Sequence, residues 1–276
     1  MNNRHAAGAE TRFEFGKNWT AFLDSVDETR VTSSIESLGS MLGTNQLEGK
    51  TFLDVGCGSG LSSLAAIRMG ATVHSFDYDA QSVACSKELK RRFAPENSRW
   101  SIEQGSALDD EYLSKLGEFD VVYSWGVLHH TGNMKRAIDL VCQRVAPSGT
   151  LFLALYHDQG SASRRWALIK RTYHRLPTFV RPAWVALIAT YYEIKFSLAR
   201  LARLQNPLPF ADWQNKSKDR GMSVWHDWVD WIGGWPFEVA TPDAVVNPLS
   251  ERSFCLHKIK TVGNGWGCNE YVLKNH

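Results

Sequence analysis

Short apolar runs alternate with helix-period segments between residues 50 and 156. The apolar runs cover residues 51–55, 71–76, 99–103, 119–124 and 149–156. Their length and their flanking turn residues predict buried strands. The segments with helical periodicity cover residues 61–69, 79–93 and 133–145. Strands that alternate with helices predict an α/β fold, in which crossover helices cover both faces of a parallel sheet.

The flanking segments extend this pattern. Residues 18–41 read as a helix with a possible break near Asp27. Thr241 followed by Pro242 is typical of a helix start. Two strand-like runs, 254–262 and 268–274, then enclose turn residues at 263–265, so they predict a hairpin with an antiparallel strand at the edge of the sheet.

Residues 157–240 are too long for a simple connection, so they predict an inserted helical cap. Residues 161–206 carry nine Lys or Arg against Glu193 alone, a net charge of +8, which leaves −6 for the rest of a chain whose net charge is +2. This segment is either a solvated basic face or a surface attracted to an anionic substrate or an anionic lipid membrane. The expected organisation is an N-terminal helical segment (1–45), a core (46–156), the basic, Trp-rich cap (157–240) and a closing helix and hairpin (241–276).

Composition narrows the class of protein. Hydrophobic residues make up 43% of the 276 residues and charged residues 22%, which excludes a wholly disordered chain. A net charge of +2 gives no reason to expect nucleic acid as a partner. Five scattered cysteines without a CxxC pair predict neither a disulfide framework nor a metal site. The most apolar stretch, 182–192, is shorter than the about 20 residues of a spanning helix, and no secretory signal is visible, so we expect a cytoplasmic protein.

The strongest chemical signal is Phe52-Leu-Asp-Val-Gly-Cys-Gly-Ser-Gly60, directly after the first strand. Glycines at 56, 58 and 60 let the backbone turn tightly and approach a ligand. A dinucleotide fingerprint would place a glycine where Leu61 stands, and Asp54 would repel a pyrophosphate. No Gly-Lys-Ser/Thr follows, which excludes a phosphate-binding P-loop. The loop therefore suits a nucleoside that carries a positive head group.

This D-x-G-x-G-x-G loop resembles the first motif of the class I S-adenosylmethionine-dependent methyltransferases. The resemblance covers residues 50–156 and, by general plan, 241–276. It implies a Rossmann-like, seven-stranded, mostly parallel sheet with an antiparallel last strand, and S-adenosyl-L-methionine as the cofactor with S-adenosyl-L-homocysteine as its product. Residues 12–19 resemble the segment that folds over the cofactor in bacterial ubiquinone-pathway-like O-methyltransferases, which implicates Phe15 and Trp19. The alternative for that segment is an amphipathic helix that covers apolar surface.

The resemblance also implies roles for later residues. Asp77, at the end of the second strand, would accept hydrogen bonds from both ribose hydroxyls. Tyr78 would lie against the adenine ring. Asp79 would cap the next helix rather than bind the cofactor. After the third strand, Ser106 would meet the adenine amino group beside Ala107, with Asp109 as the alternative. Residues 119–130 resemble the fourth motif, which places Ser124 and Trp125 at a strand's carboxyl end.

The paired histidines His129 and His130 follow that strand. In related sugar and phenol O-methyltransferases, a histidine here is the general base, and we expect His129 ahead of His130, with His157 as a further candidate. Tyr156, Trp225 and His226 are candidates for binding the acceptor, although Trp225, Trp228 and Trp231 also fit the core face of a helix. The histidines favour a small-molecule or glycan hydroxyl as the acceptor. Two alternatives remain open: an N- or C-methyltransferase and a non-catalytic cofactor-binding protein. The sequence does not determine the oligomeric state.

Overall fold

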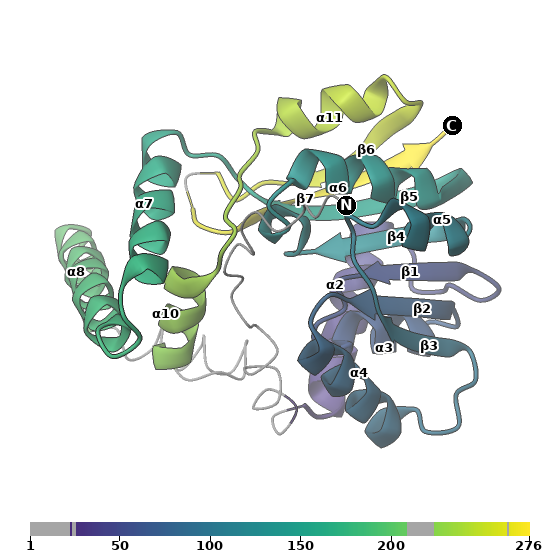
Figure 1. Ribbon diagram of the computed structural model, residues 1–276, viewed down its shortest axis with the longest axis horizontal. Helices are drawn as coiled ribbons and strands as arrows, with labels where there is room; N and C mark the ends of the chain where they lie inside the picture. Colours follow the sequence, from purple (N-terminus) through teal and green to yellow (C-terminus); the bar gives the residue numbers. More distant parts are fainter. Residues whose placement is uncertain (1–22, 24–25, 209–223, 264) are drawn as a thin grey trace, which may run out of the picture. The chain divides into compact units, whose positions relative to one another are not determined.

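The computed structural model describes residues 23, 26–208, 224–263 and 265–276 (Figure 1). The chain divides into two compact units. One comprises residues 14–160 and 238–276 and is called the sheet unit below. The other comprises residues 1–13 and 161–237 and is called the helical unit.

Seven strands form the sheet unit's single sheet. They are β1 (Thr51–Val55), β2 (Thr72–Asp77), β3 (Trp100–Gln104), β4 (Phe119–Trp125), β5 (Val145–Tyr156), β6 (Phe254–Lys260) and β7 (Cys268–Asn275). Their order is β3-β2-β1-β4-β5-β7-β6, with β1 to β5 parallel and β7 antiparallel to both of its neighbours. The predicted Rossmann-like, mostly parallel sheet with an antiparallel last strand is confirmed.

The hairpin enters the sheet with its second strand inward. Tyr271, Val272 and Leu273 of β7 are fully buried, because β7 pairs with β5 on one side and β6 on the other. After Phe254, β6 is exposed along its length and carries Lys258 and Lys260. Lysines on an edge strand discourage pairing with further chains. The antiparallel strand therefore lies one position inside the edge rather than at the edge itself.

Six α-helices accompany the sheet among the described residues of this unit. They are α2 (Glu28–Leu42), α3 (Leu61–Arg68), α4 (Ala80–Phe93), α5 (Asp110–Lys115), α6 (Met134–Val141) and α11 (Pro242–Ser250). The side chains of Asp27, Asp79 and Thr241 cap α2, α4 and α11 by accepting backbone N–H groups, which confirms the predicted break at Asp27 and the two predicted caps. The helix predicted over 133–145 is shorter, because a 3₁₀ turn (Cys142–Arg144) replaces its last turn.

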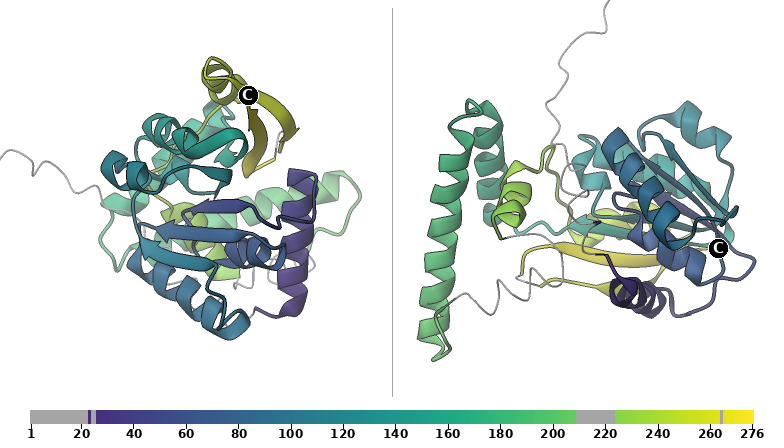
Figure 2. Two further views of the ribbon diagram at one scale, coloured as in Figure 1. Left: turned by 90° about the vertical axis from the view of Figure 1, so that its right-hand side faces the viewer. Right: turned by 90° about the horizontal axis from the view of Figure 1, so that it is seen from below.

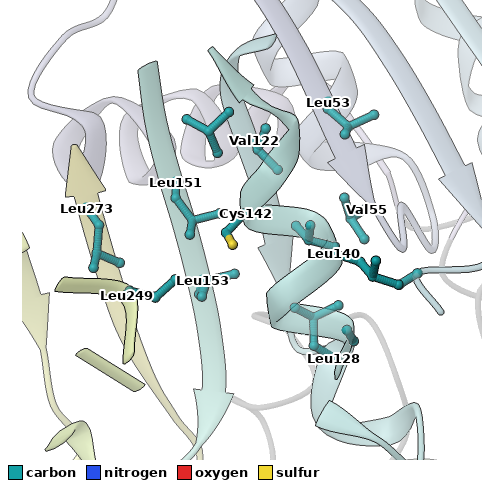
Figure 3. Packing of buried hydrophobic residues seen from close by; sticks show 14 of the residues in the cluster. Leu53, Val55, Val122, Leu128, Leu140, Cys142, Leu151, Leu153, Leu249 and Leu273 are labelled. Atoms are coloured by element: carbon teal, nitrogen blue, oxygen red, sulfur yellow. The ribbon is translucent and has the colours of Figure 1, made fainter. Parts of the chain in front are cut away.

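Alternating strand residues build a hydrophobic core on each face of the sheet. Leu53, Val122, Leu151 and Leu153 pack in one core with Leu140 of α6 (Figure 3). Their sequence neighbours point to the opposite face, where Phe52, Val121, Phe152 and Val272 pack with α2, α3 and α4. Helices thus cover both faces, as Figure 2 shows. The loops at the ends of the strands are therefore held on a rigid frame.

The helical unit has a core of its own. Its described helices are α7 (Ser161–Arg175), α8 (Arg181–Ala202) and α10 (Val224–Gly233). The buried hydrophobic residues of its core are Trp166, Tyr173, Val185, Tyr192, Trp228 and Ile232. The Trp166 and Tyr192 rings stack with centroids 4.8 Å apart. Of the three tryptophans spaced along α10, Trp228 is buried, Trp231 packs against this core, and Trp225 is exposed.

Candidate cofactor site and active site

Five loops leave the sheet at one edge, because β1 to β5 are parallel and their carboxyl ends point the same way. The chain order reverses between β1 and β4, since β2 and β3 lie on one side of β1 and β5 lies beyond β4. Ligands of open α/β sheets bind at such a switch point. The glycine loop after β1 and the turn after Trp125 of β4 flank it.

The glycine loop is tightly held against the end of β2. Gly56 and Gly60 have φ angles of 80° and 84°, in the left-handed region that favours glycine. A Cβ on Gly56 would lie 2.4 Å from Cγ1 of Val127, so no larger residue fits. The backbone N–H groups of Gly56 and Cys57 both donate to the carbonyl of Phe76, at 2.8 and 3.0 Å. The loop therefore keeps its backbone beside the end of β2.

Asp77 joins this loop to β2. Its Oδ2 accepts the N–H of Gly58 and its Oδ1 accepts the N–H of Asp79, both at 2.9 Å. Each carboxylate oxygen has a second lone pair with which it can accept a further donor. Burial raises the pKa of Asp77, while the two backbone N–H groups oppose that rise. The carboxylate is thus fixed at the sheet edge with acceptor capacity to spare, as a ribose diol requires.

Asp54 ends a buried chain of hydrogen bonds. Ser63 donates to Oδ2 of Asp54 at 2.5 Å, and the Ser63 and Ser75 hydroxyls lie 2.7 Å apart. Because the Ser63 proton is used on Asp54, Ser75 is the donor to Ser63, and Trp100 Nε1 in turn donates to the Ser75 hydroxyl at 2.8 Å. All four residues are buried. The sequence analysis did not identify Ser63, Ser75 or Trp100, which belong to α3, β2 and β3.

Burial also changes the charge of Asp54. It raises the pKa of the carboxyl to about 7, with the Ser63 hydrogen bond opposing the rise and the neighbouring Asp77 adding to it. A nearby cation would stabilise the ionised form of a carboxyl group that is buried in this way. Together, Asp54 and Asp77 provide a partner for a positive head group and an acceptor for a ribose, so the residues present fit S-adenosylmethionine.

The residues expected near adenine follow β2 and β3. Tyr78 is exposed beyond the end of β2, and Ala107 is buried. The Ser106 hydroxyl accepts the N–H of Leu108 at 3.2 Å and retains its own proton as a donor. Asp109 caps α5 by accepting the N–H of Tyr112 at 3.0 Å. The capping role makes Ser106 a better candidate for an adenine contact than Asp109.

The end of β4 contributes one buried and one exposed side chain. The Ser124 hydroxyl donates to the carbonyl of Val55 at 3.0 Å, which ties β4 to the residue just before the glycine loop. Trp125, next along the chain, is exposed. Ser124 therefore shapes the loop, whereas Trp125 offers a ring to a ligand.

The paired histidines lie in a 3₁₀ turn (Leu128–His130) and differ in burial. His129 is fully buried, and its Nδ1 accepts the N–H of Tyr156 at 3.3 Å. Its ring centroid lies 3.8 Å from the Tyr156 ring and 4.4 Å from the His130 ring. His130 is only partly buried. The structure thus brings His129, His130 and Tyr156 together at the ends of β4 and β5.

His157 is held from the other side of β5. Its Nδ1 lies 3.1 Å from Nδ2 of the fully buried Asn269, and the amide is the donor in this pair. Asp158, its neighbour, accepts the N–H of Gly160. A contact with the closing hairpin therefore positions the His157 ring just after β5.

The remaining sequence candidates are not among the described residues of the sheet unit. Phe15 and Trp19 lie outside the described residues, as does the side chain of His226. Trp225 belongs to the helical unit, where it lines a cavity of about 300 Å³ with Tyr173, Arg181, Val185 and Val229 among others. The Arg181 guanidinium lies over the Tyr173 ring at 5.2 Å.

The sheet order, the glycine loop and two acidic strand ends define the class of S-adenosylmethionine-dependent methyltransferases. Residues 28–188, more than half of the chain, match the methyltransferase domain family, and the chain belongs to that family. It is a methyltransferase enzyme, and S-adenosylmethionine is its cofactor.

Several known proteins resemble this chain. A ubiquinone biosynthesis O-methyltransferase of Rhizobium rhizogenes is 30% identical over 187 residues, which cover 63% of this chain and 70% of that protein. An uncharacterized protein of Synechococcus is 33% identical over 122 residues, which cover 44% of this chain but only 28% of that protein. The fold is similar to a magnesium protoporphyrin IX methyltransferase from Synechocystis with bound S-adenosylhomocysteine, with a TM-score of 0.52, 12% identity and coverage of 97% and 90% of the two chains.

No helix within the described ranges is both long and apolar enough to cross a bilayer. The expected cytoplasmic location stays a prediction.

Proposed function

We propose that this enzyme methylates a hydroxyl group of a small molecule or glycan, with His130 as the general base. Support comes from the relatives that are O-methyltransferases and from the histidine pair at the sheet edge. S-adenosylmethionine supplies an activated methyl group when bound, so the protein's own work is to align the acceptor and to remove its proton. Alignment contributes up to roughly 7–11 kcal/mol in favourable cases.

The observation that carries this proposal is the difference between the two histidine rings. The N–H of Tyr156 can only donate, so Nδ1 of His129 must be an acceptor, and a neutral His129 ring carries its proton on Nε2. The His129 ring is fully buried. In this tautomer its one free lone pair, on Nδ1, is already used on the Tyr156 N–H, so the ring cannot take a proton from the hydroxyl that is to be methylated. The adjacent His130 is the ring that is partly exposed. We therefore favour His130, although the sequence alone placed His129 ahead.

The same reasoning lowers the rank of His157. Its Nδ1 accepts the amide of Asn269, so its neutral ring also carries its proton on Nε2. We assign His129 and His157 as positioning residues that hold the ends of β4 and β5. We assign Tyr156 to the acceptor side, because its ring packs against both members of the histidine pair.

For the cofactor, we propose that Asp54 attracts the positive head group and that Asp77 accepts the ribose hydroxyls. Gly56, Gly58 and Gly60 supply the close backbone approach. Tyr78, Ser106, Ala107 and Trp125 complete the wall around the nucleoside, and Ser124 supports the glycine loop from behind.

The experiment compares His130→Gln with His129→Gln and with His257→Gln, a matched change on the exposed strand β6. It requires an acceptor, and phenolic and sugar hydroxyls are the first to screen. His130→Gln is expected to lower kcat about 10²-fold or more, with the affinity for S-adenosylhomocysteine unchanged. The wild-type rate is expected to rise with pH through neutrality, because the base acts only when it has lost its proton.

His257→Gln should retain full activity, and His129→Gln should act mainly on stability. Near wild-type turnover for His130→Gln would remove this histidine from the chemistry. It would favour an amine or carbon acceptor that requires no such base.

A further inference from the structure

Helix α8 exposes an apolar stripe. Leu187, Tyr191, Ile194, Leu198 and Leu201 are each between 56% and 61% exposed. Their spacing of four, three, four and three residues places them on one side of the helix. Figure 2 shows α8 at the outside of the helical unit in its right-hand view, with α7 and α10 to one side. We call these five residues the α8 stripe.

The α8 stripe is not the face that packs in the core. Val185 and Tyr192 are buried in the helical unit's core, and Phe196 packs against it. At 100° per residue these three positions lie on the opposite side of α8 from the stripe. Helix α8 is therefore apolar on two faces, and among the described residues only one of these faces packs in a core. An exposed apolar face of this size marks an interaction surface.

The exposed apolar surface continues beyond both ends of the helix. Phe179, just before α8, is 84% exposed, and Leu204, just after it, is 97% exposed. The 22 residues of α8 span about 33 Å. The stripe, from Leu187 to Leu201, runs along about 21 Å of that length, whereas no described helix can span a bilayer.

Positive charge is concentrated in the segment that contains the stripe. Arg164, Arg165, Arg171 and Arg175 of α7 are all exposed, as is Lys195 of α8. Residues 161–206 carry a net charge of +8, and their single acid, Glu193, accepts the indole N–H of Trp228 at 3.2 Å. An exposed apolar helix face in a segment of high positive charge is complementary to an anionic lipid surface, in which acyl chains lie beneath negative headgroups.

We propose that α8 lies in the interface of an anionic membrane, with the stripe inserted among the acyl chains and the arginines of α7 against the headgroups. A second copy of this chain is the less favoured occupant. Pairing two α8 helices would bring two segments of +8 together. The positions that flank the stripe, including Ile188, Thr190, Lys195 and Ser197, contain no acid that could pair with the lysine.

The test is co-sedimentation of the full chain with vesicles of phosphatidylcholine alone or of equal parts phosphatidylcholine and phosphatidylglycerol. Binding is expected on the anionic vesicles, weakening as salt screens the charges. Ile194→Glu should weaken it about tenfold or more, since it puts a charge among acyl chains. Ile259→Glu, the same change on the exposed edge of β6, should leave binding unchanged. Replacing Arg164, Arg171 and Arg175 by Gln should cost roughly fivefold per charge.

Circular dichroism and S-adenosylhomocysteine affinity check that each variant is folded. The experiment requires no methyl acceptor, so its outcome is independent of the proposed function. The proposal is overturned if the protein ignores anionic vesicles. It is equally overturned if Ile194→Glu and Ile259→Glu bind alike. A dimer that Ile194→Glu dissociates, in a protein that binds no vesicle, would assign the stripe to a second copy instead.

Discussion

Among the described Asp, Glu, Lys and Arg residues, each unit of this enzyme buries one side chain almost completely, an acid in one unit and a base in the other. Asp54 lies in the sheet unit and Lys170 in the helical unit. Burial raises the pKa of Asp54 to about 7 and lowers the pKa of Lys170 to about 7. In both cases the protein disfavours the charged form, so both groups are costly to keep ionised.

Their surroundings differ in what they provide to the charged form. The Lys170 ammonium donates to the carbonyl of Trp231 and lies 4.9 and 5.0 Å from the Trp231 and Phe237 ring centroids. These partners stabilise a cation within the unit itself. Asp54 accepts one hydrogen bond, from the Ser63 hydroxyl, and lies near Asp77, which carries the same charge. A buried anion placed beside another acid at a sheet edge is suited to a cation that arrives with a ligand.

The two groups affect stability in separate pH windows. Between pH about 4 and 7 the native Asp54 holds a proton that the unfolded chain has lost, so stability falls as pH rises. Between pH about 7 and 10 the native Lys170 has lost a proton that the unfolded chain keeps, so stability rises with pH. Each full window corresponds to about 4 kcal/mol.

The largest effect is expected for Asp54→Asn. The amide can still accept from Ser63 but has no charge, so S-adenosylmethionine should bind roughly 10–100-fold more weakly. Without ligand, the variant should lose the wild-type's decline in stability between pH 4 and 7. Denaturant unfolding at several pH values measures the difference. A variant that keeps both the affinity and the decline would separate Asp54 from the cofactor.

A smaller effect is expected for Lys170→Met, which fills the same space without charge. Wild-type protein should gain about 3 kcal/mol of unfolding free energy between pH 7 and 9 from this lysine, and the variant should not. S-adenosylhomocysteine affinity should remain that of the wild type. Lys195→Met, on an exposed lysine of α8, is the matched control and should leave the pH dependence intact. An identical pH dependence in Lys170→Met and wild type would refute the assignment.

The same contrast shows what the sequence could predict. The glycine loop, Asp54 and Asp77 are close together along the chain or at strand ends, so local pattern is sufficient to place them. The chain that holds Asp54 is different, because Ser63, Ser75 and Trp100 meet only after α3, β2 and β3 have packed. The sequence placed His129 ahead of His130, but no local pattern shows how the two rings differ. They become different through the N–H of Tyr156, 27 residues away.

The smallest effect is expected for Ser63→Ala. Loss of its hydroxyl removes a donor that favours the ionised form of Asp54, so the pKa of Asp54 should rise further. S-adenosylmethionine should bind about fivefold more weakly at pH 7 and nearly normally at pH 9, where Asp54 is ionised in both proteins. Ser62→Ala, on the adjacent residue, is the control. A loss of affinity that is independent of pH would mean that Ser63 acts on packing instead.

The central claim is that the cofactor binds at the carboxyl edge of β1 and β2. Calorimetric titration of S-adenosylhomocysteine at pH 8 tests it in wild type, Asp77→Ala and Asp79→Ala. The last variant loses the cap of α4 but keeps the carboxylate of Asp77. The prediction is binding by the wild type, at least about tenfold weaker binding by Asp77→Ala, and little change in Asp79→Ala. Unchanged affinity in Asp77→Ala, or tighter binding of NAD than of S-adenosylhomocysteine by the wild type, would contradict it.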